Sequence, residues 1–332
     1  MKDYRERVTI YEVASAAGVS VATVSRVLNN AGTVKPDTSA KVLKIIKKLG
    51  YRPSGVARSL ATNVTTNIGV IIPNANYVYI SAFLNGIAEV SKSKGFTLRL
   101  YSTSHSKEDA LKSIEKIIAD NLDGAIVFDD ELADEELDIL NEYSVPVIVI
   151  NNDKIGANIG CVNFGYQHTF KNILLEYFSK GDKKMSFLHV HNAGRLLARI
   201  EQTFIKVHME NGKDYEIINC DDSYTRTYNN FIERFRHVRE DYIVCYRDSI
   251  AAAVLNAATD SGLRVPEDVE VLSIIGTKYS EIIRPTISNL YVNMADVGKI
   301  SMYMLIDLIK GELYEKKYKF ESRYIKRNST RF

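Results

Sequence analysis

The chain has 332 residues and a formal charge of +2, and its apolar (45%) and charged (25%) fractions are those of an ordinary globular protein. This length suits a small module joined to a larger body. No apolar run approaches the roughly 20 residues that span a bilayer, and the N-terminal residues lack the apolar core of a signal peptide. We therefore expect a cytoplasmic protein with no membrane partner.

The residues that carry chemistry show no catalytic or metal-binding pattern. The three cysteines, Cys161, Cys220 and Cys245, stand far apart without CxxC or His/Cys spacing, so we interpret them as buried small apolar groups. P-loop, GxGxxG, HExxH and GxSxG motifs are missing, and the six histidines show no paired metal spacing. We expect no metal, no cofactor and no enzymatic activity.

Positive charge is concentrated near the N-terminus. Residues 1–66 contain eleven Lys or Arg and four acids, a net charge of +7, which leaves −5 on the remainder of the chain. A basic head on an acidic body is typical of a module that binds phosphates. A solvated basic surface would give the same count, so charge alone does not decide between the two.

Residues 9–49 carry the signals of three short helices. Thr9 and Glu12 form a capping-box pattern, Gly18 allows a tight turn, and Ser20 caps a second helix that ends near Leu28. This order of helix, glycine turn and helix is the unit that places its second helix in the major groove of DNA. A third helix is expected from about Asp37 to Leu49, packing through Val42, Leu43, Ile45, Ile46 and Leu49.

The segments VTIYEVASAAGVSVATVSRVLNN and VKPDTSAKVLKIIKKLGYRPSGVARSLA resemble the headpiece and hinge of the LacI/GalR (lac repressor) family of transcription regulators. The resemblance implies a helix-turn-helix headpiece over residues 1–52 and a hinge helix with linker over 53–65. It also implies a two-lobed core over 66–332 that senses an effector and dimerises. Such a homodimer binds a roughly palindromic operator in double-stranded DNA, most often as a repressor.

The resemblance also assigns the DNA contacts. Val21 and Ala22 would offer apolar contact to base edges, whereas Arg26, one turn further on, can donate two hydrogen bonds to a guanine. Leu60 matches the leucine that wedges into the minor groove, with packing against the body as the alternative. Phosphate contacts or helix caps are expected of Thr9, Tyr11, Ser20, Thr23, Ser25 and Asn29, and hinge contacts of Ser54 and Arg58.

After the hinge, apolar strands alternate with helices in two consecutive sets. Strands are expected at 67–73, 96–101, 124–129 and 146–150, and again at 185–190, 215–219, 242–246 and 269–275. Helices are expected near 79–94, 107–120, 133–142, 166–180, 195–211, 225–237 and 248–261. The pattern predicts an α/β fold with two doubly wound parallel lobes, similar to periplasmic binding proteins, and a ligand cleft at the carboxyl ends of the strands.

The expected cleft residues depart from those of the family's sugar sensors, which need carboxylates, an amide and an arginine to pair with hydroxyl groups. Residues at these places are apolar, small or changed in charge: Asn151, Gly165, Ile200, Arg247 and Ile275. Such a cleft fits an anionic or less polar effector, or no small effector. A conventional sugar-responsive repressor is the alternative, as is an ion pair between Arg247 and a neighbouring acid. The expected effector-binding residues are Tyr79, Asn151, Phe164, Arg199, Arg247 and Asp248.

Some members of the family take a phosphorylated carrier protein as corepressor, through basic residues of the N-terminal lobe. The segment DVGKISMYMLIDLIKG has Tyr303 where one such arginine is expected. A corepressor protein is therefore a doubtful partner.

Overall fold

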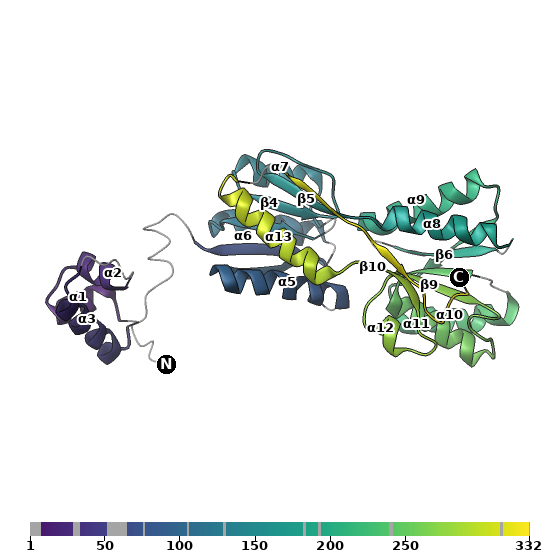
Figure 1. Cartoon of the computed structure of the whole chain (residues 1–332), viewed down its shortest axis with the longest axis horizontal. Coiled ribbons are helices and arrows are strands. Elements are labelled where there is room, and N and C mark those ends of the chain that lie inside the picture. The colour runs from purple at the N-terminus through teal and green to yellow at the C-terminus, as the bar shows by residue number, and fades with distance from the viewer. Residues whose placement is uncertain are drawn as a thin grey trace. The chain divides into compact units, whose positions relative to one another are not determined.

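The computed structural model divides the chain into two units, a headpiece (Met1–Thr66) and a body (Asn67–Phe332) (Figure 1). The structure describes residues 8–28, 34–51, 65–75, 77–104, 106–128, 131–181, 184–191, 194–238, 242–312 and 315–331. The described part of the headpiece is helical and the body is α/β, which confirms the predicted fold class.

The headpiece has the three predicted helices, α1 (Ile10–Ala17), α2 (Val21–Leu28) and α3 (Pro36–Leu49). Thr9 begins α1 with the predicted capping box, because its hydroxyl accepts from the Glu12 amide and its own amide donates to the Glu12 carboxylate at 2.6 Å. Gly18 ends α1 at φ 64°, a left-handed conformation that glycine adopts without strain. The local signals therefore fix both ends of the first helix.

A small core holds the three helices together. Val13, Ala17, Val24 and Val42 are fully buried in it. The predicted packing face of α3 is wrong at Leu43, whose side chain is 52% exposed. Each helical residue turns by about 100°, so Leu43 points away from the core that its neighbour Val42 enters.

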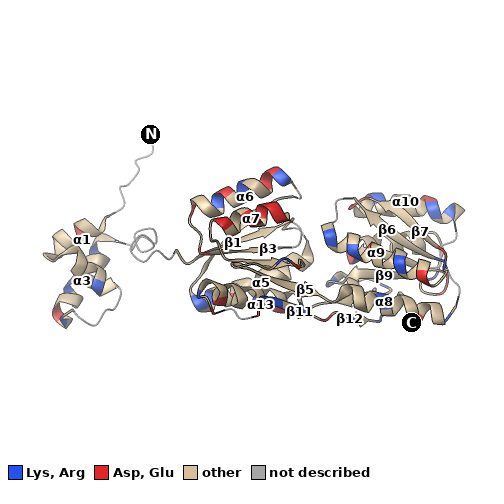
Figure 2. Ribbon diagram, turned by 90° about the horizontal axis from the view of Figure 1, so that it is seen from above, with Lys and Arg blue, Asp and Glu red and all other residues tan. Residues whose placement is uncertain are grey.

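The first part of the body, which we call the N-lobe, is a six-stranded parallel sheet in the order β11-β5-β4-β3-β1-β2. Its strands are β1 (Asn67–Ile72), β2 (Thr97–Ser102), β3 (Gly124–Val127), β4 (Val147–Ile150), β5 (Ile159–Phe164) and β11 (Lys317–Phe320). Helices α5 (Val78–Lys94) and α13 (Met294–Ile309) pack together on one face, and α6 (Lys107–Ala119) and α7 (Asp134–Glu142) cover the other (Figure 2). The central strands β3 and β4 are completely buried between these layers.

The second part, the C-lobe, repeats this plan in the order β12-β10-β9-β8-β6-β7. Its strands are β6 (Met185–Val190), β7 (Tyr215–Cys220), β8 (Tyr242–Arg247), β9 (Glu270–Ile275), β10 (Ser288–Tyr291) and the antiparallel β12 (Arg323–Ile325). Its helices are α8 (Tyr166–Ser179), α9 (Gly194–Glu210), α10 (Tyr224–His237), α11 (Asp248–Asp260) and the short α12 (Tyr279–Ile282). In each lobe the strand order reverses beside the first strand, between β1 and β3 and between β6 and β8, which is where doubly wound sheets bind ligands.

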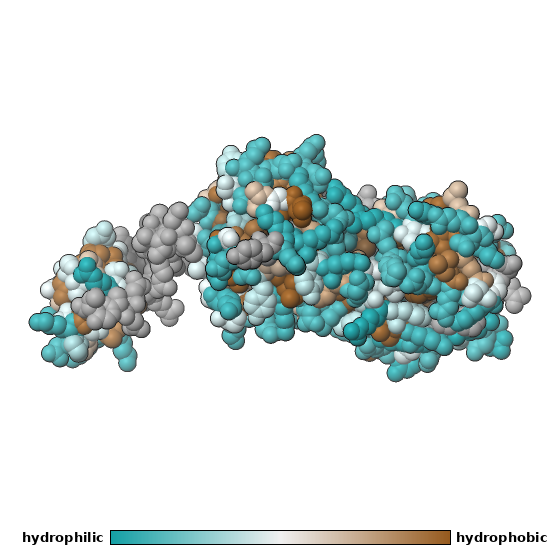
Figure 3. Space-filling model, turned by 45° about the horizontal axis from the view of Figure 1, so that its top comes forward, coloured by the Kyte–Doolittle hydropathy of each residue, from teal (hydrophilic) through white to brown (hydrophobic). Residues whose placement is uncertain are grey.

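The surface and the thiols agree with an ordinary globular body. Hydrophilic residues cover most of the face shown in Figure 3, with apolar residues in small groups. Cys161, Cys220 and Cys245 are free and buried, as predicted. Within the described ranges, no helix is long and apolar enough to cross a membrane, and no three potential ligands cluster to hold a metal ion.

Candidate nucleic-acid interface and ligand pocket

Helix α2 presents a distinct exposed face. Val24 and Val27 are buried in the headpiece core, whereas Ala22 and Arg26 are exposed and lie four residues apart, on the same side of the helix. The half-buried Val21 lies at the beginning of this face. The side chain that can read a base by hydrogen bonds is therefore free of the core and next to a small apolar group.

Several of the other expected DNA contacts also act as helix caps. The Ser20 hydroxyl accepts from the Thr23 amide at 3.2 Å and lies 2.9 Å from the Thr23 hydroxyl, so the pair caps α2. Ser25 is half-buried, and Tyr11 is 72% exposed on α1. Asn29, Ser54, Arg58 and Leu60 lie outside the described residues, and their roles remain predictions.

A pocket of about 200 Å³ lies between the two lobes and brings three of the predicted effector residues together: Asn151, Phe164 and Arg199. The pocket is also lined by Lys317 and Lys319, which the sequence analysis did not single out. They lie on β11, a short strand that pairs with β5, so Lys319 comes opposite Asn163. The alternating lysines of KYKF were the signal in the sequence, but only this pairing shows that they reach the pocket.

Three cations, Arg199, Lys317 and Lys319, and the carboxylate of Asp153 line this pocket, and Lys319 also pairs with Glu321 at 3.0 Å. Lys317 binds Asp153, and this hydrogen bond lowers the pKa of Asp153 and raises that of Lys317. Arg199 donates to the Asn151 carbonyl at 2.6 Å. The Asn163 side chain donates to Asp153 at 2.8 Å, and its buried oxygen has no hydrogen-bond partner within the described part of the chain. The pocket therefore offers three cations, two of which pair with a carboxylate, and one free acceptor.

Arg247 has a different setting from the one predicted for a ligand contact. It forms an ion pair with Asp222, the alternative that the sequence left open, and only 11% of its side chain is exposed. Its guanidinium lies 4.3 Å from the centre of the Tyr77 ring. Tyr79 is buried and stacks on Tyr77 at 5.6 Å between ring centres.

The Asp248 carboxylate is used within the C-lobe. One of its oxygens accepts from the backbone amides and hydroxyls of Thr277 and Ser280, at 2.6 to 3.1 Å. These bonds join the start of α11 to α12 and the turn before it, so the carboxylate serves a structural contact within the C-lobe. The six predicted effector residues thus fall into three separate settings.

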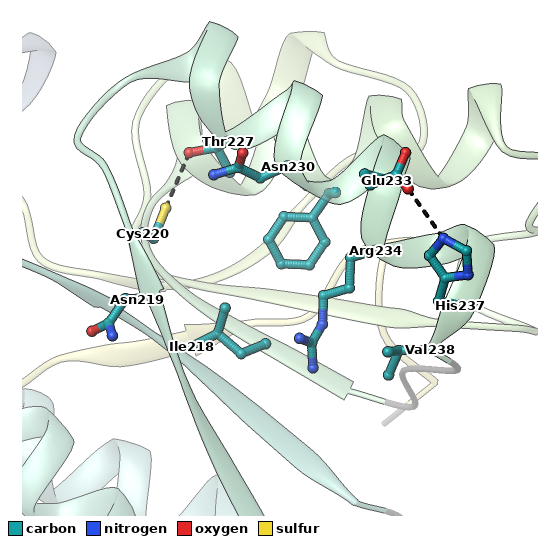
Figure 4. A pocket seen from close by; sticks show the side chains of 10 residues that line it. Ile218, Asn219, Cys220, Thr227, Asn230, Glu233, Arg234, His237 and Val238 are labelled. Carbon is teal, nitrogen blue, oxygen red and sulfur yellow. Dashed lines mark hydrogen bonds and ion pairs between the residues drawn. The ribbon is translucent and has the colours of Figure 1, made fainter.

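A second, larger groove of about 410 Å³ lies away from the inter-lobe pocket, between α10 and the edge strand β7 (Figure 4). Phe231 and Ile218 contribute apolar lining, and Arg234 projects between Ile218 and Val238. At one end the Cys220 thiol lies 3.0 Å from the Thr227 hydroxyl, and at the other Glu233 pairs with His237 at 3.0 Å. The first contact joins the two walls of the groove, β7 and α10, whereas the second lies within α10.

A helix-turn-helix headpiece with an exposed arginine on its second helix, joined to a two-lobed α/β body, defines a DNA-binding transcription regulator. Comparisons with known proteins agree. Residues 9–54 match the model of bacterial regulatory proteins of the lacI family, and residues 180–330 match that of the periplasmic binding protein-like domain. The chain is 30% identical to catabolite control protein A of Staphylococcus aureus (strain Mu50 / ATCC 700699), covering 93% of this chain and 94% of the relative. It is 33% identical to catabolite control protein A of Staphylococcus xylosus, over 92% and 93% of the two chains.

The chain therefore belongs to the lacI family of bacterial regulatory proteins. Solved structures share its fold. The lac repressor dimer bound to operator and an anti-inducer has a TM-score of 0.84 at 21% identity, over 98% of this chain and 99% of that one. The transcription regulator CcpA of Lactococcus lactis has a TM-score of 0.69 at 20% identity, over 80% and 99%.

Proposed function

We propose that this chain is a repressor that binds a palindromic operator as a homodimer and reads its bases through α2. The observation that carries the proposal is the exposed face of α2, where Arg26 and Ala22 stand clear of the headpiece core. The net charge of +7 over residues 1–66 supplies the phosphate attraction. A lac repressor structure of the same fold is described as a dimer on its operator, which supports the proposed assembly.

Replacing Arg26 and Lys48 separately distinguishes recognition of bases from contact with phosphates. Arg26→Ala should relax the preference at one base pair in each half-site, at a cost of about 1 to 3 kcal/mol, because it removes two hydrogen bonds to a base. Lys48, exposed on α3, should contact only phosphate, so Lys48→Ala should weaken binding to all sequences alike. Selection of sites from a random DNA pool with the full chain and both variants gives the preference at each position. Identical preferences for the wild type and Arg26→Ala would refute the proposed reading.

We infer further that the effector is a small anion, such as a sugar phosphate or an organic acid, bound in the inter-lobe pocket. Three cations line this pocket, with Lys317 paired to Asp153 and Lys319 to Glu321, and charge-assisted hydrogen bonds from Arg and Lys are the strong contacts for carboxylate or phosphate. A volume of about 200 Å³ is small beside the several hundred Å³ typical of larger ligands. Arg247 contributes less to effector binding than predicted, because Asp222 already neutralises its charge.

A thermal-shift screen tests this effector class. Sugar phosphates and organic acids should stabilise the full chain, whereas uncharged monosaccharides should not. Lys319→Gln should remove the shift because it deletes a pocket cation, whereas Lys326→Gln, an exposed lysine outside the pocket lining, should leave it unchanged. Micromolar affinity for an uncharged monosaccharide would contradict the proposal.

A further inference from the structure

Three of the body's own side chains occupy the place where doubly wound lobes present their ligands. Tyr77 follows β1 in the N-lobe, while Asp222 follows β7 and Arg247 ends β8 in the C-lobe. β1 and β8 are each next to the point where strand order reverses, and ligands bind at the carboxyl ends of strands there. The three residues thus lie at the expected ligand position, and they come from both lobes.

The contacts among these residues form a closed triangle. Arg247 pairs with Asp222, its guanidinium lies 4.3 Å from the centre of the Tyr77 ring, and the Tyr77 hydroxyl donates to Asp222 at 3.1 Å. With 11% of Arg247 and 35% of Asp222 exposed, solvent screens the pair less than it screens a surface ion pair. Two of the three contacts join one lobe to the other.

The Tyr77 corner and the backbone next to Asp222 are each held by contacts within their own lobe. The Tyr77 ring stacks on Tyr79, with 20° between the ring planes. The centres of the Tyr79 and Phe128 rings are 5.8 Å apart. On the C-lobe side, the Asp221 carbonyl accepts from the Cys220 thiol at 3.2 Å and the Thr227 hydroxyl at 3.3 Å. These contacts hold the ring and the backbone beside the acid in place, which lowers the entropy lost when the lobes close.

We propose that Tyr77, Asp222 and Arg247 form an inter-lobe latch that keeps the two lobes closed with no small molecule bound. The latch does for this chain what a ligand in the cleft does for a binding protein that closes around it. The latch goes beyond the proposed function, because the two lobes would then close through their own side chains and without an effector. It also fills the position at the β1 and β8 ends with a tyrosine ring, so an effector is confined to the separate pocket beside Arg199.

Distance measurement between spin labels on the two lobes tests the latch. Tyr143→Cys next to α7 and Met209→Cys on α9 place labels at positions that are 63% and 70% exposed, while the three native cysteines are buried. The full chain carrying both labels is measured without ligand, alone and with Tyr77→Phe, Tyr77→Ala or Asp222→Ala. Tyr303→Ala, which removes a 44% exposed tyrosine from α13, is the matched control.

The doubly labelled chain and the control should show one narrow, short distance without ligand. Asp222→Ala and Tyr77→Ala should add a longer distance, with the ratio of closed to open molecules reduced by about tenfold or more, as expected for loss of a bond to a charged group. Tyr77→Phe keeps the ring over Arg247 and should give an intermediate ratio. A long or broad distribution in the starting chain would overturn the latch, as would an unchanged distribution in folded Asp222→Ala and Tyr77→Phe proteins.

Discussion

At the scale of single residues, buried polar groups set the conditions under which the body is stable. His208 is fully buried and packed against Phe178 and Phe204, with ring centres 4.8 and 4.1 Å away. Its Nδ1 donates to the Phe204 carbonyl at 2.7 Å, and its buried Nε2 has no hydrogen-bond partner among the described residues. Burial lowers the pKa of His208 below its usual 6.5, so the folded body holds a neutral ring.

The lowered pKa predicts a loss of stability in mild acid. Below pH 6.5 the unfolded chain binds a proton that the folded chain does not, so the free energy of unfolding falls as pH falls, by at most about 1.4 kcal/mol per pH unit. Urea unfolding of the body at pH 7.5 and 5.5 measures this difference. His208→Leu should show a smaller difference than the wild type, whereas His237→Gln, at an exposed histidine, should not. Equal pH dependence in all three proteins would show that His208 stays protonated or becomes exposed.

Two adjacent residues of the candidate site have tertiary partners that the sequence pattern did not predict. Arg247 and Asp248 are neighbours in the chain and were both predicted to face an effector. In the structure one binds Asp222 and the other holds Thr277 and Ser280. Which acid or hydroxyl meets each side chain depends on tertiary packing, and nothing in the local pattern specifies it.

At the scale of elements, the prediction was accurate wherever a local signal was strong. The eight predicted strands and seven predicted helices of the body are present, with ends that differ by at most two residues. The capping box at Thr9 and the glycine turn at Gly18 fixed the headpiece helices in the same way. Apolar runs and caps are local, and so they can be recognised without knowing the fold.

The strands that were missed lack such a signal. β11 has the sequence KYKF and is an exposed edge strand, β10 has four residues and β12 has three. β5 is buried and six residues long, but glycine and asparagine interrupt its apolar run. All four are defined by their pairing with neighbouring strands, which the local sequence does not specify. Two pocket lysines lie on β11, so missing this strand also hid part of the site.

The crossing of α5 and α13 depends on two glycines. A Cβ added at Gly86 would lie 1.9 Å from the Ala295 carbonyl oxygen, and one at Gly298 would lie 2.1 Å from that of Phe83. Real atoms do not approach so closely, so the helices must separate if either position gains a side chain. The absence of a side chain at both positions therefore sets the distance between the two helices.

Gly86→Ala should accordingly destabilise the body. Alanine favours a helix by up to about 1 kcal/mol over glycine, but forcing two packed backbones apart costs about 1 to 3 kcal/mol or more. Asn85→Ala, at the exposed neighbouring position of α5, gains helix propensity without the clash and should be neutral or slightly stabilising. Denaturant unfolding compares the two variants. A Gly86→Ala protein as stable as the wild type would mean that the helices can separate at little cost.

At the scale of the whole molecule, the headpiece and the body differ in charge and in architecture. The headpiece sequence carries +7 and the body −5, so attraction to phosphate is concentrated where α2 presents Arg26. The body contributes two lobes, a cationic pocket and contacts that join the lobes. Composition and periodicity predicted the basic headpiece and the two-lobed body. The contacts between the lobes appeared only in the structure.

This chain should bind DNA with sequence preference, through the headpiece. The most direct test is a competition titration of the full chain between its selected palindromic site and a scrambled duplex of the same length, over a series of salt concentrations. The selected site should bind at least about 10³-fold more tightly, and affinity for both duplexes should fall steeply as salt rises. Equal affinity for the two duplexes would contradict sequence-specific binding, because phosphate attraction alone would then explain all binding.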